Sequence, residues 1–221
     1  MKTVSPFEVK DCALIAIATG KRAQNLRELC EHLRDIDHDC IYYHFWAGLL
    51  RPRFDNPEYH NDFAIWVAHS LHNKELAEKL AIIDPDNIES LEKLRTRLID
   101  TIEEVLDQSQ IPDWSKRDDQ FEFIRSQIII FNTRATIPKP KGFVNMIPKM
   151  SVGSIFYHFI DSRRRNPGSL DDYRNWLMRF GEEYKELRQM IGEICPYFTP
   201  LRTLRSQLHD CFQSYFRGSL Q

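Results

Sequence analysis

Two histidines occupy equivalent places in a segment that occurs twice in this chain. Residues 41–45 read Ile-Tyr-Tyr-His-Phe, and residues 155–159, which lie 114 positions later, read Ile-Phe-Tyr-His-Phe. An imidazole can exchange a proton near neutral pH, ligate a metal or position a substrate. His44 and His158 are therefore the first candidates for chemistry. The alternative is that each histidine forms a structural hydrogen bond within its own half.

An aspartate follows each of these histidines. Asp62 and Asp172 each begin an Asp-aromatic-x-x-Trp segment, and a carboxylate at that place could orient the imidazole. In a hydrolase or transferase for a phosphorylated or anionic small molecule, His44 would act as the general acid or base, Asp62 would orient it and Arg51 would bind the anionic group. A structural His–Asp bond would be repeated by a duplicated fold just as readily.

Arginines follow both histidine segments, as Arg51-Pro52-Arg53 in the first half and as residues 163–165 in the second. Guanidinium groups bind phosphates and carboxylates with two hydrogen bonds, so two such clusters could hold an anionic small ligand or an acidic partner. The alternative is a solvated helix end, where arginine complements the helix dipole. The expected ligand-binding residues are Tyr43, His44, Arg51, Arg53, Tyr157, His158, Arg164 and Arg165.

Other common chemistries lack their motifs. A short span of the first half contains five histidines and an aspartate that could converge on a metal, namely His38, His44, His60, Asp62, His69 and His72. Only His44 and Asp62 have counterparts in the second half, so we expect no metal site. The glycine-rich spacings that bind nucleotides and the G-x-S-x-G turn of serine hydrolases are absent, and we expect no cofactor. The five cysteines form no C-x-x-C pair and are expected to be reduced and mostly buried.

Composition narrows the possible partners further. The 221 residues include 30 basic and 32 acidic side chains, and a net charge of −2 gives no general attraction to nucleic acid or to an anionic membrane. The longest uncharged apolar run, residues 13–19, is far shorter than the roughly 20 residues of a membrane-spanning helix. We therefore expect a cytoplasmic protein that binds neither nucleic acid nor membranes.

The elements that must position these residues also recur at the 114-residue interval. An apolar stretch opens each half: residues 121–133 are typical of a strand, whereas residues 7–19, richer in alanine, fit a strand or a short helix. Helices are expected next, with Asp62 and Ser90 as N-caps. The predicted fold is α+β and predominantly α-helical. It has two tandem homologous modules, residues 1–110 and 115–221, with a small β element in each and a pseudo-two-fold arrangement.

The chain also resembles a known family. Residues 25–29 (Asn-Leu-Arg-Glu-Leu), 41–44 (Ile-Tyr-Tyr-His), 61–66 (Asn-Asp-Phe-Ala-x-Trp) and 75–80 (Glu-Leu-Ala-Glu-Lys-Leu) are similar to those of an uncharacterised prokaryotic domain of unknown function. The resemblance covers nearly the whole chain, although the second half lacks the first of these motifs. It implies no assigned reaction and no catalytic residues, and only an association with carbohydrate or glycosyltransferase metabolism.

These observations favour a non-catalytic accessory or regulatory protein that binds an anionic small ligand or a protein partner. The hydrolase or transferase with His44 is the competing hypothesis, and the position of His44 relative to a solvent-filled pocket would separate the two. A third hypothesis is a homodimer formed through an exposed apolar face on the terminal helix, around Phe212, Tyr215 and Phe216.

Overall fold

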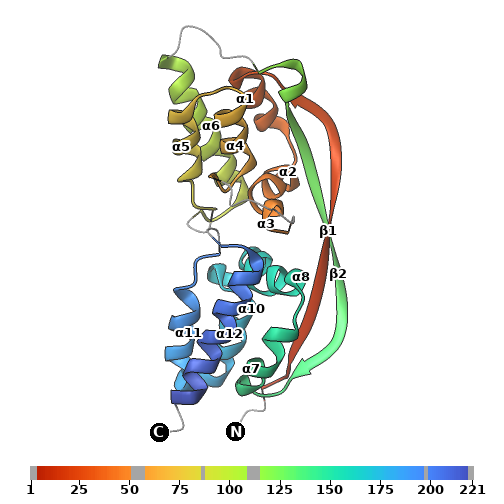
Figure 1. The fold of residues 1–221 in the computed structure, drawn as a ribbon, viewed down its shortest axis with the longest axis vertical. Helices are drawn as coiled ribbons and strands as arrows, with labels where there is room; N and C mark the ends of the chain where they lie inside the picture. Colours follow the sequence, from red (N-terminus) through yellow and green to blue (C-terminus); the bar gives the residue numbers. More distant parts are fainter. Residues whose placement is uncertain (1–3, 51–57, 86–87, 109–114, 197–198, 219–221) are drawn as a thin grey trace. The chain divides into compact units, whose positions relative to one another are not determined.

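Two long strands and a series of helices make up the fold. The computed structural model describes residues 4–50, 58–85, 88–108, 115–196 and 199–218. Strands β1 (Phe7–Ala23) and β2 (Phe121–Ile137) form a two-stranded antiparallel sheet, and the other elements are helical (Figure 1). The chain is therefore α+β and mainly helical, as expected. The strand predicted within residues 121–133 is confirmed, and the stretch over residues 7–19 is also a strand.

The helices fall into two series that follow the two strands. After β1 come α1 (Leu26–Asp35), α2 (His38–Tyr42), the π-helix η1 (Tyr43–Ala47), α3 (Gly48–Leu50), α4 (Asp62–His69), α5 (Lys74–Ala81) and α6 (Leu91–Gln108). The short 3-10 helix η3 (Arg117–Asp119) precedes β2. After β2 come η4 (Pro140–Gly142), α7 (Phe143–Met146), η5 (Ile147–Lys149), α8 (Val152–Ile155), the π-helix η6 (Phe156–Asp161), α9 (Ser162–Arg165), η7 (Pro167–Ser169), α10 (Asp172–Leu177), η8 (Met178–Tyr184), α11 (Lys185–Gly192) and α12 (Leu201–Gly218).

Side-chain caps fix where several of these helices begin. The Ser90 hydroxyl accepts a hydrogen bond from the Lys93 amide ahead of α6, as the sequence predicts. At α4, however, the cap is Asn61, whose side chain accepts from the Ala64 amide, so the prediction of Asp62 as the N-cap is wrong by one residue. Because Asn61 takes that place, the Asp62 carboxylate is left available for His44.

Contacts divide the chain into two compact units that do not follow the order of the sequence. Unit 2 consists of Leu14–Gln127, and unit 1 combines Met1–Ala13 with Ile128–Gln221. Each unit therefore contains part of β1 and part of β2, and in each the strand segments lie along one side of the helices (Figure 1). The tandem modules 1–110 and 115–221 describe the repeat in the sequence and stay a prediction. The compact units have other boundaries, because each unit contains residues from both halves of the sequence.

Each unit has its own apolar core. Leu29, Leu33, Phe63 and Leu76 are fully buried in unit 2, and unit 1 buries Phe143, Tyr173, Leu187 and Phe212. Phe212 therefore lies in a core and not on an exposed face of α12, while Tyr215 and Phe216 are half-buried against Tyr184. In the described part of the chain, no helix combines the length and the apolar character needed to cross a membrane.

Candidate functional site

The two histidine segments adopt the same uncommon backbone. Tyr43–Ala47 forms the π-helix η1 in unit 2, and Phe156–Asp161 forms the π-helix η6 in unit 1. Such helices are rare and are often found at functional sites. Every side chain in both segments is buried, with Tyr43 2% and Tyr157 5% exposed. Their polar groups therefore face the protein interior.

His44 makes a hydrogen bond with each of its ring nitrogens. Its Nδ1 lies 3.0 Å from Oδ2 of Asp62, and its Nε2 lies 3.1 Å from the backbone nitrogen of Ile124 in β2. A backbone N–H can only donate, so Nε2 accepts and the ring proton resides on Nδ1, from which it is donated to Asp62. The Phe121 ring covers the imidazole at a centroid distance of 4.6 Å. Neither nitrogen is left to act on a substrate.

His158 repeats this arrangement in unit 1. Its Nδ1 lies 2.8 Å from Oδ2 of Asp172, and its Nε2 accepts from the backbone N–H of Lys10 at 2.8 Å. The Phe7 ring lies against it at 4.8 Å. Lys10 and Ile124 are themselves 114 positions apart. Each histidine is thus bonded to the strand that begins the other half of the chain.

Other side chains hold the same strands at the same interval. The Trp66 indole N–H donates to the carbonyl of Asp119 at 2.7 Å, and that of Trp176 donates to the carbonyl of Ser5 at 2.8 Å. Ser5 and Asp119 lie two residues before β1 and β2, respectively. The tryptophans therefore act as anchors for the strand entries.

The arginines expected to clamp a ligand are engaged with their own unit where they are described. Arg165 donates from Nε to Asp161 at 2.9 Å and from Nη2 to the Tyr157 carbonyl at 3.0 Å, and its guanidinium lies 4.0 Å from the centroid of the Tyr157 ring. Arg164 also bonds Asp161, at 3.2 Å. Arg51 and Arg53 lie outside the described residues. The structure thus brings the second cluster against an internal carboxylate.

Asp172 accepts hydrogen bonds from three side chains of this network. It accepts from His158, from Asn166 at 2.8 Å and from Arg165 at 3.3 Å. Burial alone would raise the pKa of Asp172, but the hydrogen bonds from His158 and Asn166 and the nearby positive charge of Arg165 outweigh burial and lower it. The carboxylate is therefore kept ionised as a structural acceptor.

The described residues provide little for other chemistry. No group of three or more His, Cys, Asp or Glu side chains among them is arranged to hold a metal ion. Cys12, Cys30, Cys40 and Cys211 are buried free thiols, and Cys195 is exposed.

A cavity lies elsewhere in unit 2, at the C-terminal end of α5. Its volume is about 540 Å³, and it is lined by Lys79, Ile82, Ile83, Asp84, Ile88, Glu89, Lys93 and Arg97. Among the predicted site residues that the structure describes, none lines it. The sequence carries a weak signal for it, the apolar pair Ile82-Ile83 before the Asp-Pro-Asp segment, of which Ile82 is exposed and Ile83 buried.

The amino-acid sequence matches the model of a known protein family. A family model described as a family of unknown function, DUF5752, matches residues 4–213. The chain belongs to this family. The family spans both strands and both histidine segments, which confirms the resemblance to an uncharacterised domain.

A solved structure shares the DUF5752 fold of this chain. OrfY from Thermoproteus tenax is 25% identical in sequence, with a TM-score of 0.81 over 97% of each chain. No protein of the curated set matches the chain. The similarity extends over the strands and helices together and carries no reaction with it.

Proposed function

We propose that this DUF5752 chain is a non-catalytic accessory protein that acts by binding a protein partner. The observation that carries the proposal is the double engagement of His44 and His158, since both ring nitrogens of each are bonded to groups of the same unit. A general acid or base must reach a proton of its substrate, directly or through one water. Bonds to a buried strand amide leave no such path.

A binding role for an anionic small ligand at the paired arginines has less support. Arg165 is held by Asp161, Asp172 and the Tyr157 ring, so an incoming anion would have to displace carboxylates that are already within bonding distance. Tyr157 and His158 are buried beneath it. A protein partner does not require these interior groups, because it can use the surface of either unit.

We also propose that the two halves descend from one duplicated module. The His-to-strand, His-to-Asp and Trp-to-carbonyl bonds each occur twice, and their donors and acceptors are separated by similar intervals. A structural bond is repeated by duplication without any pressure from a reaction. The histidines are then parts of the fold, and the partner is recognised elsewhere.

Long-range ¹H–¹⁵N NMR of the histidine side chains in the full chain tests the non-catalytic role. We expect His44 and His158 to show the Nδ1–H tautomer, unchanged on addition of millimolar phosphate, pyrophosphate or glucose 6-phosphate. Exposed His69, on α4, serves as the control that reports solvent and buffer effects. A shift of either buried ring with one anion, accompanied by turnover of a phosphate ester that His44→Ala abolishes, would establish the enzyme hypothesis instead.

The partner is tested by cross-linking in intact cells followed by purification of the tagged full chain. Co-purification of one other protein at a constant molar ratio to the tagged chain supports the proposal. Recovery of the chain alone, at expression levels close to the natural one, would contradict it.

A further inference from the structure

One stretch of β2 in unit 1 is exposed on both of its faces. At the start of the strand the pattern alternates, with Phe121 and Phe123 buried and Glu122 exposed. From Ile129 to Arg134 all six residues are exposed. A strand whose successive side chains point to opposite faces can show this pattern only where neither face is covered.

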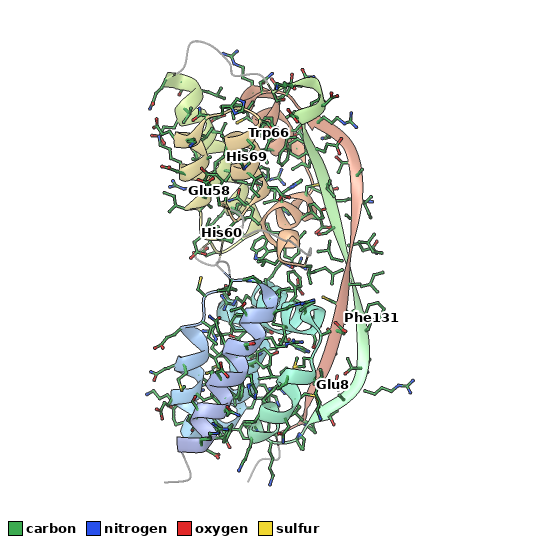
Figure 2. All side chains as sticks on the ribbon, in the orientation of Figure 1. Glu8, Glu58, His60, Trp66, His69 and Phe131 are labelled. Atoms are coloured by element: carbon green, nitrogen blue, oxygen red, sulfur yellow. The ribbon has the colours of Figure 1, made fainter. Side chains whose placement is uncertain are left out.

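Three large apolar side chains lie in this exposed stretch. Ile129 is 38%, Ile130 50% and Phe131 49% exposed. Phe131 lies on β2 on the side away from the helices of unit 1 (Figure 2). Ile129 and Phe131 share one face of the strand, and Ile130 points to the other. Exposed apolar side chains that lie together in this way mark interaction sites in soluble proteins.

The edge of the strand is open as well. The sheet has two strands among the described residues, so one edge of β2 has no strand bonded to it. Proteins usually protect such edges with charged residues or proline, yet residues 126–133 contain neither. Unpaired backbone groups beside exposed Ile and Phe side chains form a template for another strand.

Arg134 ends the stretch in a strained conformation. Its φ angle is +62°, a region that residues other than glycine adopt at a cost, and the residue 114 positions earlier is Gly20, with φ +77°. Its backbone N–H donates to the Asn132 side chain, but its guanidinium makes no hydrogen bond or ion pair with any residue that the structure describes. An arginine that is strained and whose side chain has no partner among the described residues indicates a side chain that serves an external group.

We propose that Ile129–Arg134 docks an extended segment of a protein partner, which adds to the edge of β2 and places an acidic side chain against Arg134. This inference rests on the proposed function and gives the partner its chemistry: alternating apolar residues that cover Ile129 and Phe131, and a carboxylate near one end. Aromatic residues and arginine are the side chains most enriched at the energetic centres of protein interfaces.

A second copy of this chain fits the stretch less well. β2 contains one acidic residue, Glu122, and this carboxylate is bound to Arg22 at 2.9 Å. Two copies paired antiparallel through this stretch would place each Arg134 opposite Ile129 of the other copy, and residues 129–134 contain no carboxylate to pair with the guanidinium. The charge of the stretch therefore calls for a different, acidic segment.

The experiment uses a library of random 12-residue peptides displayed on phage and selected against the immobilised full chain. We expect enriched peptides to alternate β-branched or aromatic residues with polar ones and to share an acidic residue. Binding of the best synthetic peptide, measured by fluorescence anisotropy, should weaken on the order of tenfold or more in Phe131→Ser and in Arg134→Glu. Selection against Arg134→Glu should enrich basic residues in place of the acidic one.

Matched controls come from the other unit. Ile82 is 79% exposed, and Arg97 is an exposed cation with no side-chain hydrogen bond or ion pair to the residues described. Ile82→Ser and Arg97→Glu should leave the affinity within about twofold of the wild type, since exposed substitutions away from an interface are nearly neutral. Circular dichroism melting of all four variants confirms that each is folded.

Four outcomes would overturn the docking site: no enriched peptide, enriched peptides without acidic residues, binding that Phe131→Ser and Arg134→Glu leave unchanged, or a wild-type dimer in sedimentation that Phe131→Ser dissociates. If any of these outcomes occurs and the NMR signals of His44 and His158 do not respond to the anions, the docking surface is rejected but the non-catalytic role stands. Histidine rings that respond to an anion reject the proposed function itself, so the two failures are distinguishable.

Discussion

Replacing His158 with alanine should loosen a residue almost 150 positions away in the sequence. The imidazole accepts the Lys10 N–H, donates to Asp172 and packs on the Phe7 ring. A donor left without its acceptor costs about 1–3 kcal/mol, and removal of a buried ring adds a cavity term of comparable size. Asp172 keeps its bonds from Asn166 and Arg165, so its share of the loss is small. We expect His158→Ala to destabilise unit 1 by about 3–5 kcal/mol.

Amide hydrogen exchange followed by NMR locates this loss within the chain. A destabilisation of about 3 kcal/mol corresponds to a protection factor lower by about a hundredfold at the Lys10 amide. The Ile124 amide, which donates to His44 in unit 2, should keep its protection. His44→Ala should give the reverse pattern, with Ile124 exposed to exchange and Lys10 protected.

The control for this measurement is His69→Ala, a substitution of an exposed histidine on α4 (Figure 2). It should change stability by no more than about 0.5 kcal/mol. Equal, small effects of His158→Ala and His69→Ala would refute the structural assignment, and the buried histidines would then require another role. A loss of protection spread evenly over both units would instead refute the independence of the two units, since it would show that they unfold together.

Three further predictions follow from the same contacts. The pKa of Asp172 is lowered in the folded chain, so the stabilisation from its carboxylate is complete above the ordinary pKa of 3.8 and is lost as the pH falls through the lowered pKa. Asp172→Asn should therefore make Tm depend less steeply on pH below about pH 4. Gly153→Ala would drive Cβ into the backbone carbonyl oxygen of Cys12 and should lower stability by about 2 kcal/mol or more. Gly192→Ala, in contrast, meets only the flexible end of Arg174 and should leave Tm unchanged or raised. Burial raises the pKa of the thiols of Cys12 and Cys30 to about 12, so iodoacetamide at pH 8 should alkylate exposed Cys195 alone in the folded chain, as peptide mass spectrometry would report.

The local character of most elements could be predicted from the sequence. The run Ile128-Ile129-Ile130-Phe131 indicates a strand because β-branched and aromatic residues suit a pleated backbone, and β2 confirms it. The alanines at residues 13, 16 and 18 leave the first stretch ambiguous, since alanine favours helices. Its strand state depends on pairing with β2, a contact between residues far apart in the chain that local propensity does not contain.

The candidate site shows the same limit. The repeat of His44 and His158 with their following aspartates indicates hydrogen-bonded pairs, and the structure places Asp62 and Asp172 at Nδ1 of the two rings. The second partner of each ring is a backbone amide, which carries no signature in the sequence. Without that partner, a histidine with one free nitrogen and a structural histidine look alike, so the chemical and structural hypotheses could not be separated before the fold was described.

Because each compact unit contains segments of both strands, fragments of residues 1–110 and 14–127 should differ in their ability to fold alone. Residues 1–110 contain the helices of unit 2 but lack Phe121 and Phe123, which are 4% and 1% exposed. Phe121 stacks on Phe63 at 5.0 Å and covers His44, and the missing strand also supplies the amide for that ring. Loss of one buried phenylalanine costs about 3–5 kcal/mol, and two such losses reach the whole stability of a typical domain.

A fragment of residues 14–127 has nearly the same length but retains both strand segments and every one of these contacts. We expect it to melt cooperatively and to give a dispersed NMR spectrum, whereas residues 1–110 should be unfolded or molten. The opposite result, with 1–110 folded and 14–127 not, would show that the first module closes its core without β2. The first module would then be stable without the bond from His44 to Ile124. The buried histidines would require a role other than holding the strand that begins the other half of the chain.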